Sequence, residues 1–168
     1  VIALTGLPID PLFPPTKIAW LLQHHSTRVK NICVGTVDSW LIWKLSGGQV
    51  HATDQSNAAR TQLFNLVKGV WDADLCDLFG VPIDSLPKVQ DSSHIFGETA
   101  GTTVLPDGIP IASAIGDSHA ALFGHGAFGP GDGKITFGTG SSVMMTLPTF
   151  SAPPKGLTTT IAWSLNGQ

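Results

Sequence analysis

The residues best suited to chemistry are an aspartate that follows an apolar run and a threonine that lies between two glycines further along the chain. The β-prone run 109–115 ends at Gly116-Asp117, and the Ala- and Leu-rich residues 118–128 predict a small-residue helix. Asp117 would then lie where a buried strand ends and a helix begins. That place is the carboxyl edge of a sheet, where α/β proteins bind ligands.

Gly138-Thr139-Gly140 joins two further β-prone segments, 134–137 and 141–146. The glycines would let backbone N–H groups approach an anion closely, and the hydroxyls of Thr139 and its serine neighbours can add donors. A carboxylate followed by an anion-binding hairpin suggests phosphoryl transfer.

Each of these motifs also has a purely structural interpretation. An aspartate between a strand and a helix is often a helix N-cap. A Gly-x-Gly turn is often an ordinary hairpin turn whose glycines supply positive φ angles. Neither motif alone predicts a function, and it is their close succession that favours the catalytic interpretation.

The composition sets the class of protein. The chain has 168 residues, of which 42% are hydrophobic and 12% charged, so it can bury a sizeable core. A net charge of −3 provides no basic field, so we expect neither nucleic acid nor a membrane as a partner. No apolar run approaches the ~20 residues that span a bilayer, and no secretory signal is recognised. Cys33 and Cys76 lie in apolar contexts without metal-ligand spacing, which predicts buried reduced thiols and a cytoplasmic location.

Two amphipathic helices are expected early in the chain. Residues 16–23 predict a short helix in which Trp20 packs into the core while the stem of Lys17 lies along it. Residues 36–45 predict a second helix capped by Thr36. Its predicted inward stripe consists of Val37, Trp40, Leu41 and Lys44 or Leu45.

The clearest helix is predicted over residues 72–80, capped by Asp72 and ended by Gly80. Its acids fall mainly in the early turns, which is a pattern of stability, so we expect no chemistry there. A brief buried strand is predicted over 31–35. The small polar run 55–61 fits the lining of a cleft and an exposed turn equally well.

The histidines do not have the spacing of a metal site. His24 and His25 are adjacent and would point to different faces of a helix. His119 and His125 are separated by neither three nor four positions, so we expect both to be structural histidines with satisfied hydrogen bonds.

Taken in order, these motifs resemble those of the FGGY family of carbohydrate kinases, and most of all its glycerol kinase-like members. The resemblance extends from Thr5 to about Thr146. The matching segments are Thr5–Pro11, Thr16-Lys17 with Trp20–Leu22, Gly35–Leu45, Thr53–Asn65, Gly116–Gly124 and Gly138–Gly140.

This resemblance implies an α/β fold of the actin-like, ribonuclease H-like kind, present only in part, with ATP in the cleft between two lobes. Residues 1–128 would form the later part of the N-terminal, sugar-binding lobe. Residues 129–168 would form the first hairpin and following segment of the C-terminal, nucleotide-binding lobe.

By the same resemblance, Asp117 matches the general base, and Thr139, flanked by Gly138 and Gly140, matches the group that binds the terminal phosphates of ATP. A positioned carboxylate can accept the proton of a sugar hydroxyl, while hydrogen-bond donors and Mg²⁺ hold the γ-phosphoryl group in line. No metal site made by the chain itself is predicted.

Three departures concern the substrate. Glycerol kinases have Tyr at the position of Leu12, Gln at that of Ser118 and Phe at that of Ser142, and in these relatives all three contact glycerol. Losing two polar ligands and one apolar wall would leave a small triol poorly held. A larger or different polyol or sugar is therefore favoured, with glycerol as the second candidate.

Two phosphate- and adenosine-binding segments of the family, an Asp-Gly-Thr-type loop and a Gly-Gly segment, are absent, so the piece alone is expected to be inactive.

The leading hypothesis is an ATP-dependent carbohydrate kinase acting on a small-molecule sugar or polyol, with assembly into a homo-oligomer left open. The alternative is a catalytically silent actin-like binding or regulatory module. A sugar hydrolase is disfavoured, because no second acid is placed comparably to Asp117.

Overall fold

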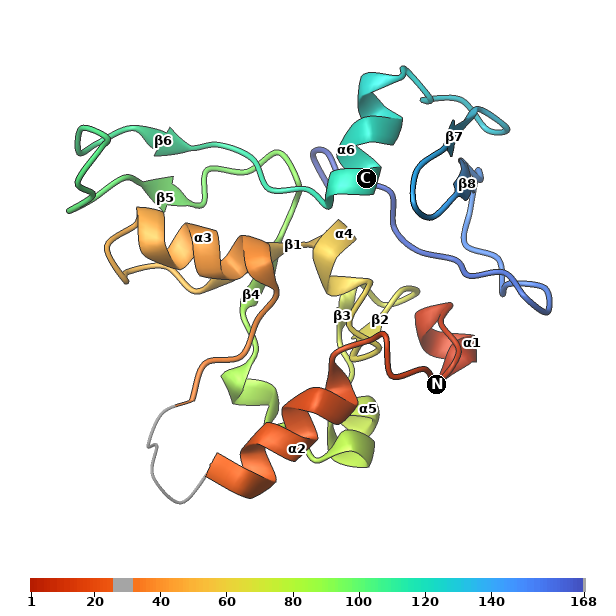
Figure 1. The fold of residues 1–168 in the computed structure, drawn as a ribbon, viewed down its shortest axis with the longest axis horizontal. Helices are drawn as coiled ribbons and strands as arrows, with labels where there is room; N and C mark the ends of the chain where they lie inside the picture. Colours follow the sequence, from red (N-terminus) through yellow and green to blue (C-terminus); the bar gives the residue numbers. More distant parts are fainter. Residues whose placement is uncertain (26–31, 168) are drawn as a thin grey trace.

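The computed structural model describes residues 1–25 and 32–167, so Asn31 and the side chain of His25 lie outside the described part of the protein. Short helices alternate with strands of two to four residues (Figure 1). The helices are α1 (Ile2–Thr5), α2 (Pro15–His25), α3 (Val37–Leu45), α4 (Gln55–Ala58), α5 (Ala73–Phe79), the 3₁₀ helix η2 (Ile83–Ser85) and α6 (Asp117–Gly124). The strands are β1 (Ala52–Asp54), β2 (Phe64–Asn65), β3 (Val70–Trp71), β4 (Lys88–Gln90), β5 (Gly97–Glu98), β6 (Pro110–Ile111), β7 (Gly133–Thr136) and β8 (Ser142–Met145).

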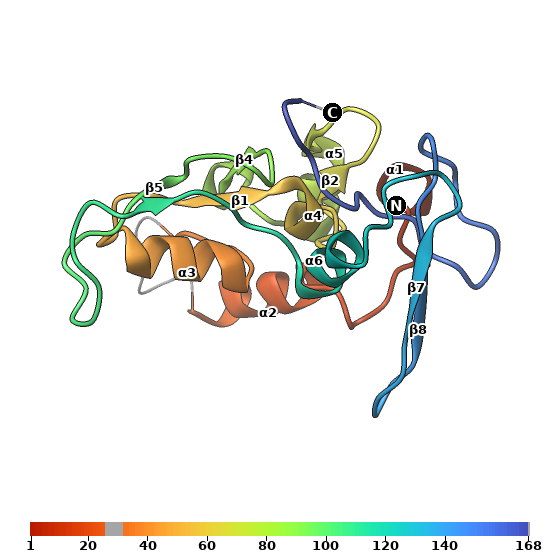
Figure 2. The ribbon, with the colours of Figure 1, turned by 90° about the horizontal axis from the view of Figure 1, so that it is seen from above.

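The described strands form four pairs, of which only β1 and β4 run parallel. Ala52 pairs with Lys88 and Asp54 with Gln90. Every residue of β1 is buried, as is usual for a parallel strand, and α3 and α4 both pack against it. Figure 2 shows α3 running along this pair. The carboxyl end of β1 leads directly into α4.

Within residues 1–25 and 32–167, three small clusters contain most of the buried hydrophobic side chains. The first lies where α2 meets α5, the second under α3 and β1, and the third around α4 and β2. Their buried members are Ile18, Leu63, Cys76 and Val81; Ile42, Ala52, Phe96 and Ile111; and Ala58, Ala59 and Phe64.

The predicted strand over 109–115 is mostly wrong. Only Pro110 and Ile111 form a strand, β6, which pairs antiparallel with β5. Pro110 has no N–H to donate to a ladder, and Ile109 is exposed, so the run does not become a buried central strand. Residues 112–116 have no regular secondary structure and lead into α6.

The brief buried strand predicted over 31–35 is also absent from its described part, residues 32–35. Cys33, which lies there, is exposed, whereas Cys76 is buried as predicted. Burial, together with the nearby acids Asp72 and Asp77, raises the pKa of the Cys76 thiol to about 11.

The prediction that Trp20 packs into the core is wrong, and so is most of the inward stripe predicted for α3. Trp20 is 54% exposed and stacks on His24, with ring centroids 4.3 Å apart. In α3 the buried residues are Ser39 and Ile42, while Trp40 is 60% exposed and is approached by the ammonium of Lys44.

A polar contact explains why α3 turns this way. The hydroxyl of Thr53 in β1 donates a hydrogen bond of 2.6 Å to the Asp38 carboxylate, which places the polar side of the first turn against the strand. Thr36 is the N-cap residue, as predicted, but its hydroxyl donates to Asp38 and makes no cap bond.

The last part of the chain returns to the N-terminal part. The amide of Thr159 donates to the carbonyl of Gly6 (3.0 Å), and Ile161 packs against the third core cluster. Near the end, Ser164 and Ser92 hydrogen-bond to each other. A segment assigned to the second of the two predicted domains therefore packs against the first.

Helix α5 is confirmed. Asp72 is its N-cap and accepts a hydrogen bond from the amide of Leu75, and Gly80 ends it in the left-handed conformation. The side-chain amide of Asn65 donates to the same carboxylate (2.8 Å), and this contact is the main reason why the pKa of Asp72 is lowered.

The lowered pKa leads to a pH-dependent prediction. Stability contributed by Asp72 is fully present above its unfolded-state pKa of about 3.9 and is lost as the pH falls through the lower folded-state value. We expect Asp72→Ala to cost about 1–2 kcal/mol near pH 7 and less as the solution is acidified below about pH 4. Urea unfolding of the parent and variant across this range measures the difference, and a constant difference would contradict the role of the charge.

Candidate active site

Asp117 is the first residue of α6, and its side chain is exposed to solvent. The N-cap residue is Gly116, and no side chain caps this helix. The Asp117 carboxylate accepts a hydrogen bond from the adjacent amide of Ser118 (2.6 Å), which is not a cap interaction with the following turn. The cap interpretation therefore does not account for this aspartate.

The turn before Asp117 is held by α4. The amide of Gly116 donates to the hydroxyl of Ser56 at 2.9 Å, a contact between residues 60 positions apart. Figures 1 and 2 both show α4 beside α6. Since α4 starts where β1 ends, Asp117 does lie near the carboxyl end of a strand, but that strand is β1 and not the run 109–115.

His119 is buried one turn into α6, and its Nε2 has no hydrogen-bond partner in the described structure. The prediction of a structural histidine with satisfied hydrogen bonds is therefore not met at Nε2. Burial and the positive charge of Arg60 lower the pKa of His119, while Asp54 and Asp117 act in the opposite direction. The net effect favours the neutral form of the ring.

Arg60 is one of the charged residues near His119. The sequence analysis included it only within a matching segment and gave it no role of its own. Its guanidinium lies over the ring of Phe13, 5.1 Å from the centroid, and burial lowers its pKa. Leu12 precedes Phe13 and is 74% exposed. Arg60 thus connects the loop that carries Leu12 with the charges around His119. The sequence did contain a signal for it, because Arg60 is the only charged residue in the run 55–61.

The predicted hairpin is confirmed. β7 and β8 pair antiparallel from Gly133↔Met145 to Thr136↔Ser142, and residues 137–141 connect them. Figures 1 and 2 show the pair beside α6, extending from the rest of the chain. Lys134 is buried at its base, where the ammonium donates to the hydroxyl of Thr136 (2.8 Å) and contributes to the lowered pKa of His119.

The glycines of this connection are not required by the local backbone. Neither Gly138 nor Gly140 has a positive φ angle, so the ordinary hairpin-turn interpretation does not explain them. A Cβ atom at Gly138 would meet only the carbonyl oxygen of Gly140, at 3.6 Å, and one at Gly140 would meet nothing. Thr139 between them is exposed.

The remaining predicted substrate residues differ in exposure. Ser118 is half-buried on the first turn of α6, and Ser142 is exposed at the start of β8. The structure therefore places Asp117 and Ser118 together on α6, and Thr139 and Ser142 together on the hairpin.

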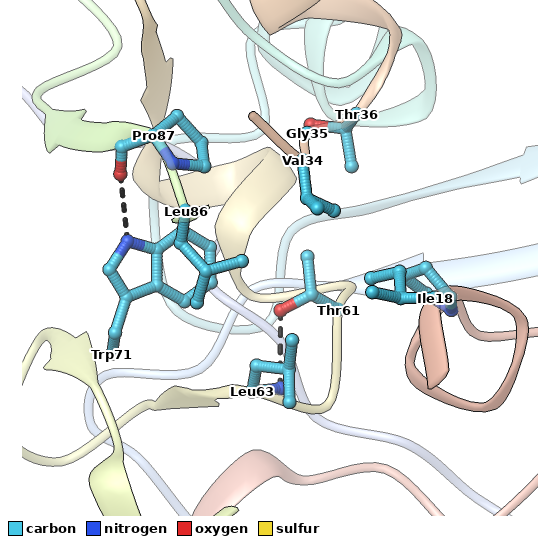
Figure 3. Close-up of a pocket in the computed structure, with 10 residues that line it drawn as sticks. Ile18, Val34, Gly35, Thr36, Thr61, Leu63, Trp71, Leu86 and Pro87 are labelled. Atoms are coloured by element: carbon cyan, nitrogen blue, oxygen red, sulfur yellow. Dashed lines mark hydrogen bonds between the residues drawn. The ribbon is translucent and has the colours of Figure 1, made fainter. Parts of the chain in front are cut away.

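A small cavity of about 20 Å³ lies elsewhere, between α2, residues 34–36 and residues 86–87 (Figure 3). Its wall includes Ile18, Leu63 and Trp71, whose indole donates to the carbonyl of Pro87. None of the predicted site residues lines it. Its volume suits about one water molecule, so it is a packing void and not a substrate site.

Within residues 1–25 and 32–167, no three or more acidic, histidine or cysteine side chains are grouped as a metal ion would require. None of the helices in the same residues has the length and apolar character needed to cross a membrane.

Comparison with known proteins decides the family. The model of the N-terminal domain of the FGGY family of carbohydrate kinases matches residues 1–124. The chain belongs to the FGGY family of carbohydrate kinases. The family predicted from the motifs is therefore confirmed.

Two curated relatives show how far the similarity extends. The apulose kinase of Pectobacterium atrosepticum is 49% identical over 166 residues, which are 95% of this chain and 34% of that protein. The glycerol kinase of Bdellovibrio bacteriovorus is 47% identical over 174 residues, covering all of this chain and 35% of that protein. The chain thus spans about a third of the length of the relatives it matches.

Solved structures agree on the fold. A Plasmodium falciparum glycerol kinase crystallised with ADP superposes on 96% of this chain with a TM-score of 0.90 and 31% identity, over 33% of that structure. The xylulose kinase from Rhodospirillum rubrum matches 92% of this chain and 32% of its own, with a TM-score of 0.77 and 23% identity, which supports the fold alone. The fold is the actin-like, ribonuclease H-like α/β fold, present in part, as predicted.

Proposed function

We propose that the protein to which this chain contributes transfers the γ-phosphoryl group of ATP to a hydroxyl of a sugar or polyol, with Asp117 as the general base. Membership of the family supports the reaction class. The observation that supports the assignment of Asp117 is an exposed carboxylate at the start of α6 that does not cap its helix. An exposed carboxylate that is not used as a helix cap is available to take a proton.

The chemistry follows from these groups. Asp117 accepts the hydroxyl proton as the substrate oxygen forms its bond to the γ-phosphorus, and the bond between that phosphorus and the leaving ADP breaks. Thr139 and the amides of Gly138 and Gly140 would donate hydrogen bonds to the terminal phosphates, and the open space around both glycines fits a close approach. When bound with the nucleotide, Mg²⁺ would neutralise charge on the phosphates, which commonly supply most of its ligands.

For the substrate we propose a sugar or polyol other than glycerol, with glycerol as the second candidate. Leu12 and Ser142 leave an apolar and a short polar side chain exposed at two of the proposed substrate positions. The apulose kinase and the glycerol kinase are nearly equally similar to this chain, so sequence identity does not distinguish between the two substrates.

An ADP-release assay of the whole protein with glycerol, apulose and a panel of ketoses and polyols tests both the proposed reaction and the proposed substrate class. Substrate-stimulated release with any acceptor supports the kinase, and the preferred acceptor identifies the substrate class. If no acceptor stimulates release, the silent binding module is the correct function instead.

The open surroundings of Gly138 give a second prediction. We expect Gly138→Ala to weaken ATP binding by about tenfold, because a methyl group would stand where the phosphates approach and one charge-assisted hydrogen bond is worth roughly 1.5–3 kcal/mol. Thermal stability should not change, since the methyl meets no close neighbour. Calorimetric titration with ATP measures the effect, with Gly124→Ala, which also has open space, as the control. Equal affinity in both variants contradicts a phosphate contact at Gly138.

A further inference from the structure

Asp54 is a fully buried carboxylate at the junction of β1 and α4. It accepts hydrogen bonds from the amides of Ser56 and Asn57 (both 3.0 Å), from the side-chain amide of Asn57 (2.8 Å) and from the hydroxyl of Ser92 (2.6 Å). Burying a carboxylate is costly unless its hydrogen bonds are satisfied, and here they are. The bonds from the amides of Ser56 and Asn57 cap α4, but the bond from Ser92 is not part of the cap.

The segment that delivers Asp117 is anchored at two points. The amide of Ala114 donates to the carbonyl of Ser92 (3.1 Å), and the amide of Gly116 donates to the hydroxyl of Ser56 (2.9 Å). Residues 112–116 have no regular secondary structure, so no helix or sheet ladder fixes them in place. These two bonds therefore hold the backbone immediately before α6.

Both anchors are tied to one oxygen atom. Oδ2 of Asp54 accepts from the amide of Ser56 and from the hydroxyl of Ser92. The Ser92 hydroxyl in turn accepts from the amide of Ser164, which joins the returning C-terminal segment to the same group. Satisfied buried networks of this kind are rigid, because each polar group has one favourable arrangement.

We propose that Asp54, acting through Ser56 and Ser92, is a positioning residue that sets the place of the Asp117 carboxylate. This inference rests on the proposed function of Asp117. Proton transfer needs the base within hydrogen-bond reach of the substrate hydroxyl, and a displacement of about 1 Å can cost about 100-fold in rate. Asp54 does not contact the substrate, and its effect is on geometry alone.

Ser56→Ala in the whole protein is the sharpest test, because it removes the acceptor of the Gly116 amide and leaves Asp54 and its cap bonds in place. We expect kcat to fall about tenfold or more with KM for ATP unchanged. Hydrogen exchange of the peptide that contains Gly116 should become faster. Asp54→Asn, which weakens both anchors, should lower kcat further.

Ser85→Ala is the matched control. Ser85, in η2, is also buried, and its hydroxyl donates to a local carbonyl, that of Pro82. This variant loses one buried hydrogen bond without touching the network, so its kcat and the exchange of the Gly116 peptide should equal those of the parent.

The outcomes separate the inference from the function on which it rests. A lower kcat and faster exchange in Ser56→Ala, but not in Ser85→Ala, support the positioning role. If Asp117→Asn abolishes transfer while Ser56→Ala keeps kcat within about twofold of the parent, the positioning role is wrong and the proposed function stands. If the parent protein phosphorylates no acceptor, both are wrong, because there is no reaction for Asp54 to support.

Discussion

Asp117→Asn in the whole protein is expected to lower kcat by about 10²–10⁴-fold and to leave nucleotide binding nearly unchanged. Asparagine has the same shape and can still accept the bond from the Ser118 amide, but it cannot take up a proton. The loss therefore reports on base catalysis and not on the shape of the site. Steady-state ADP release and calorimetric titration with ATP measure the two quantities.

The matched control for this variant is Asp74→Asn. Asp74 is also an exposed aspartate in the first turn of a helix, α5, so both substitutions remove the same favourable interaction with a helix N-terminus. Both should destabilise the protein slightly and equally, and only Asp117→Asn should lose turnover. Retained turnover in Asp117→Asn would remove the assignment of the general base.

The largest effect on stability is expected at Phe64. This side chain is fully buried among Ala58 and Ala59 and meets Trp71 edge to face, with ring centroids 5.4 Å apart. Phe64→Ala should lower the free energy of unfolding by about 3–5 kcal/mol, because the transfer energy of the ring is lost and the cavity collapses only in part. Urea unfolding followed by tryptophan fluorescence measures the change.

Phe137→Ala provides the comparison, since Phe137, which follows β7 directly, is 84% exposed. Its substitution should change stability by no more than about 0.5 kcal/mol, as is usual for surface positions. An equal loss in the two variants would mean that the third core cluster does not stabilise the protein as described.

The elements that were predicted correctly are those that carry their own signals. Helix α5 has an N-cap aspartate at one end and a glycine at the other. The hairpin of β7 and β8 pairs residues close in sequence. Such features depend on neighbours within a few positions, so the local sequence contains all the information needed to predict them.

The elements that were mispredicted depend on distant partners. The apolar pattern of α3 predicted that Trp40 faces the core. In the structure, the hydrogen bond between Thr53 and Asp38 places the polar side of the helix against β1, and Trp40 faces the solvent. The apolar run 109–115 looked like a central strand, but Pro110 limits its pairing to two residues. In each case one polar or backbone constraint outweighed the apolar pattern.

By itself, the amino-acid sequence determined the family and the reaction class it indicates, and it named the acid and the glycine-flanked threonine as candidates, because ordered motifs and residue chemistry are readable along the chain. Only the tertiary structure decided that Asp117 does not cap its helix, that Asp117 and Arg60 both act on the buried His119, and that the buried Asp54 links the two anchors of the turn before Asp117. These last contacts join residues up to 60 positions apart, and no local propensity specifies which distant hydroxyl a buried amide will meet.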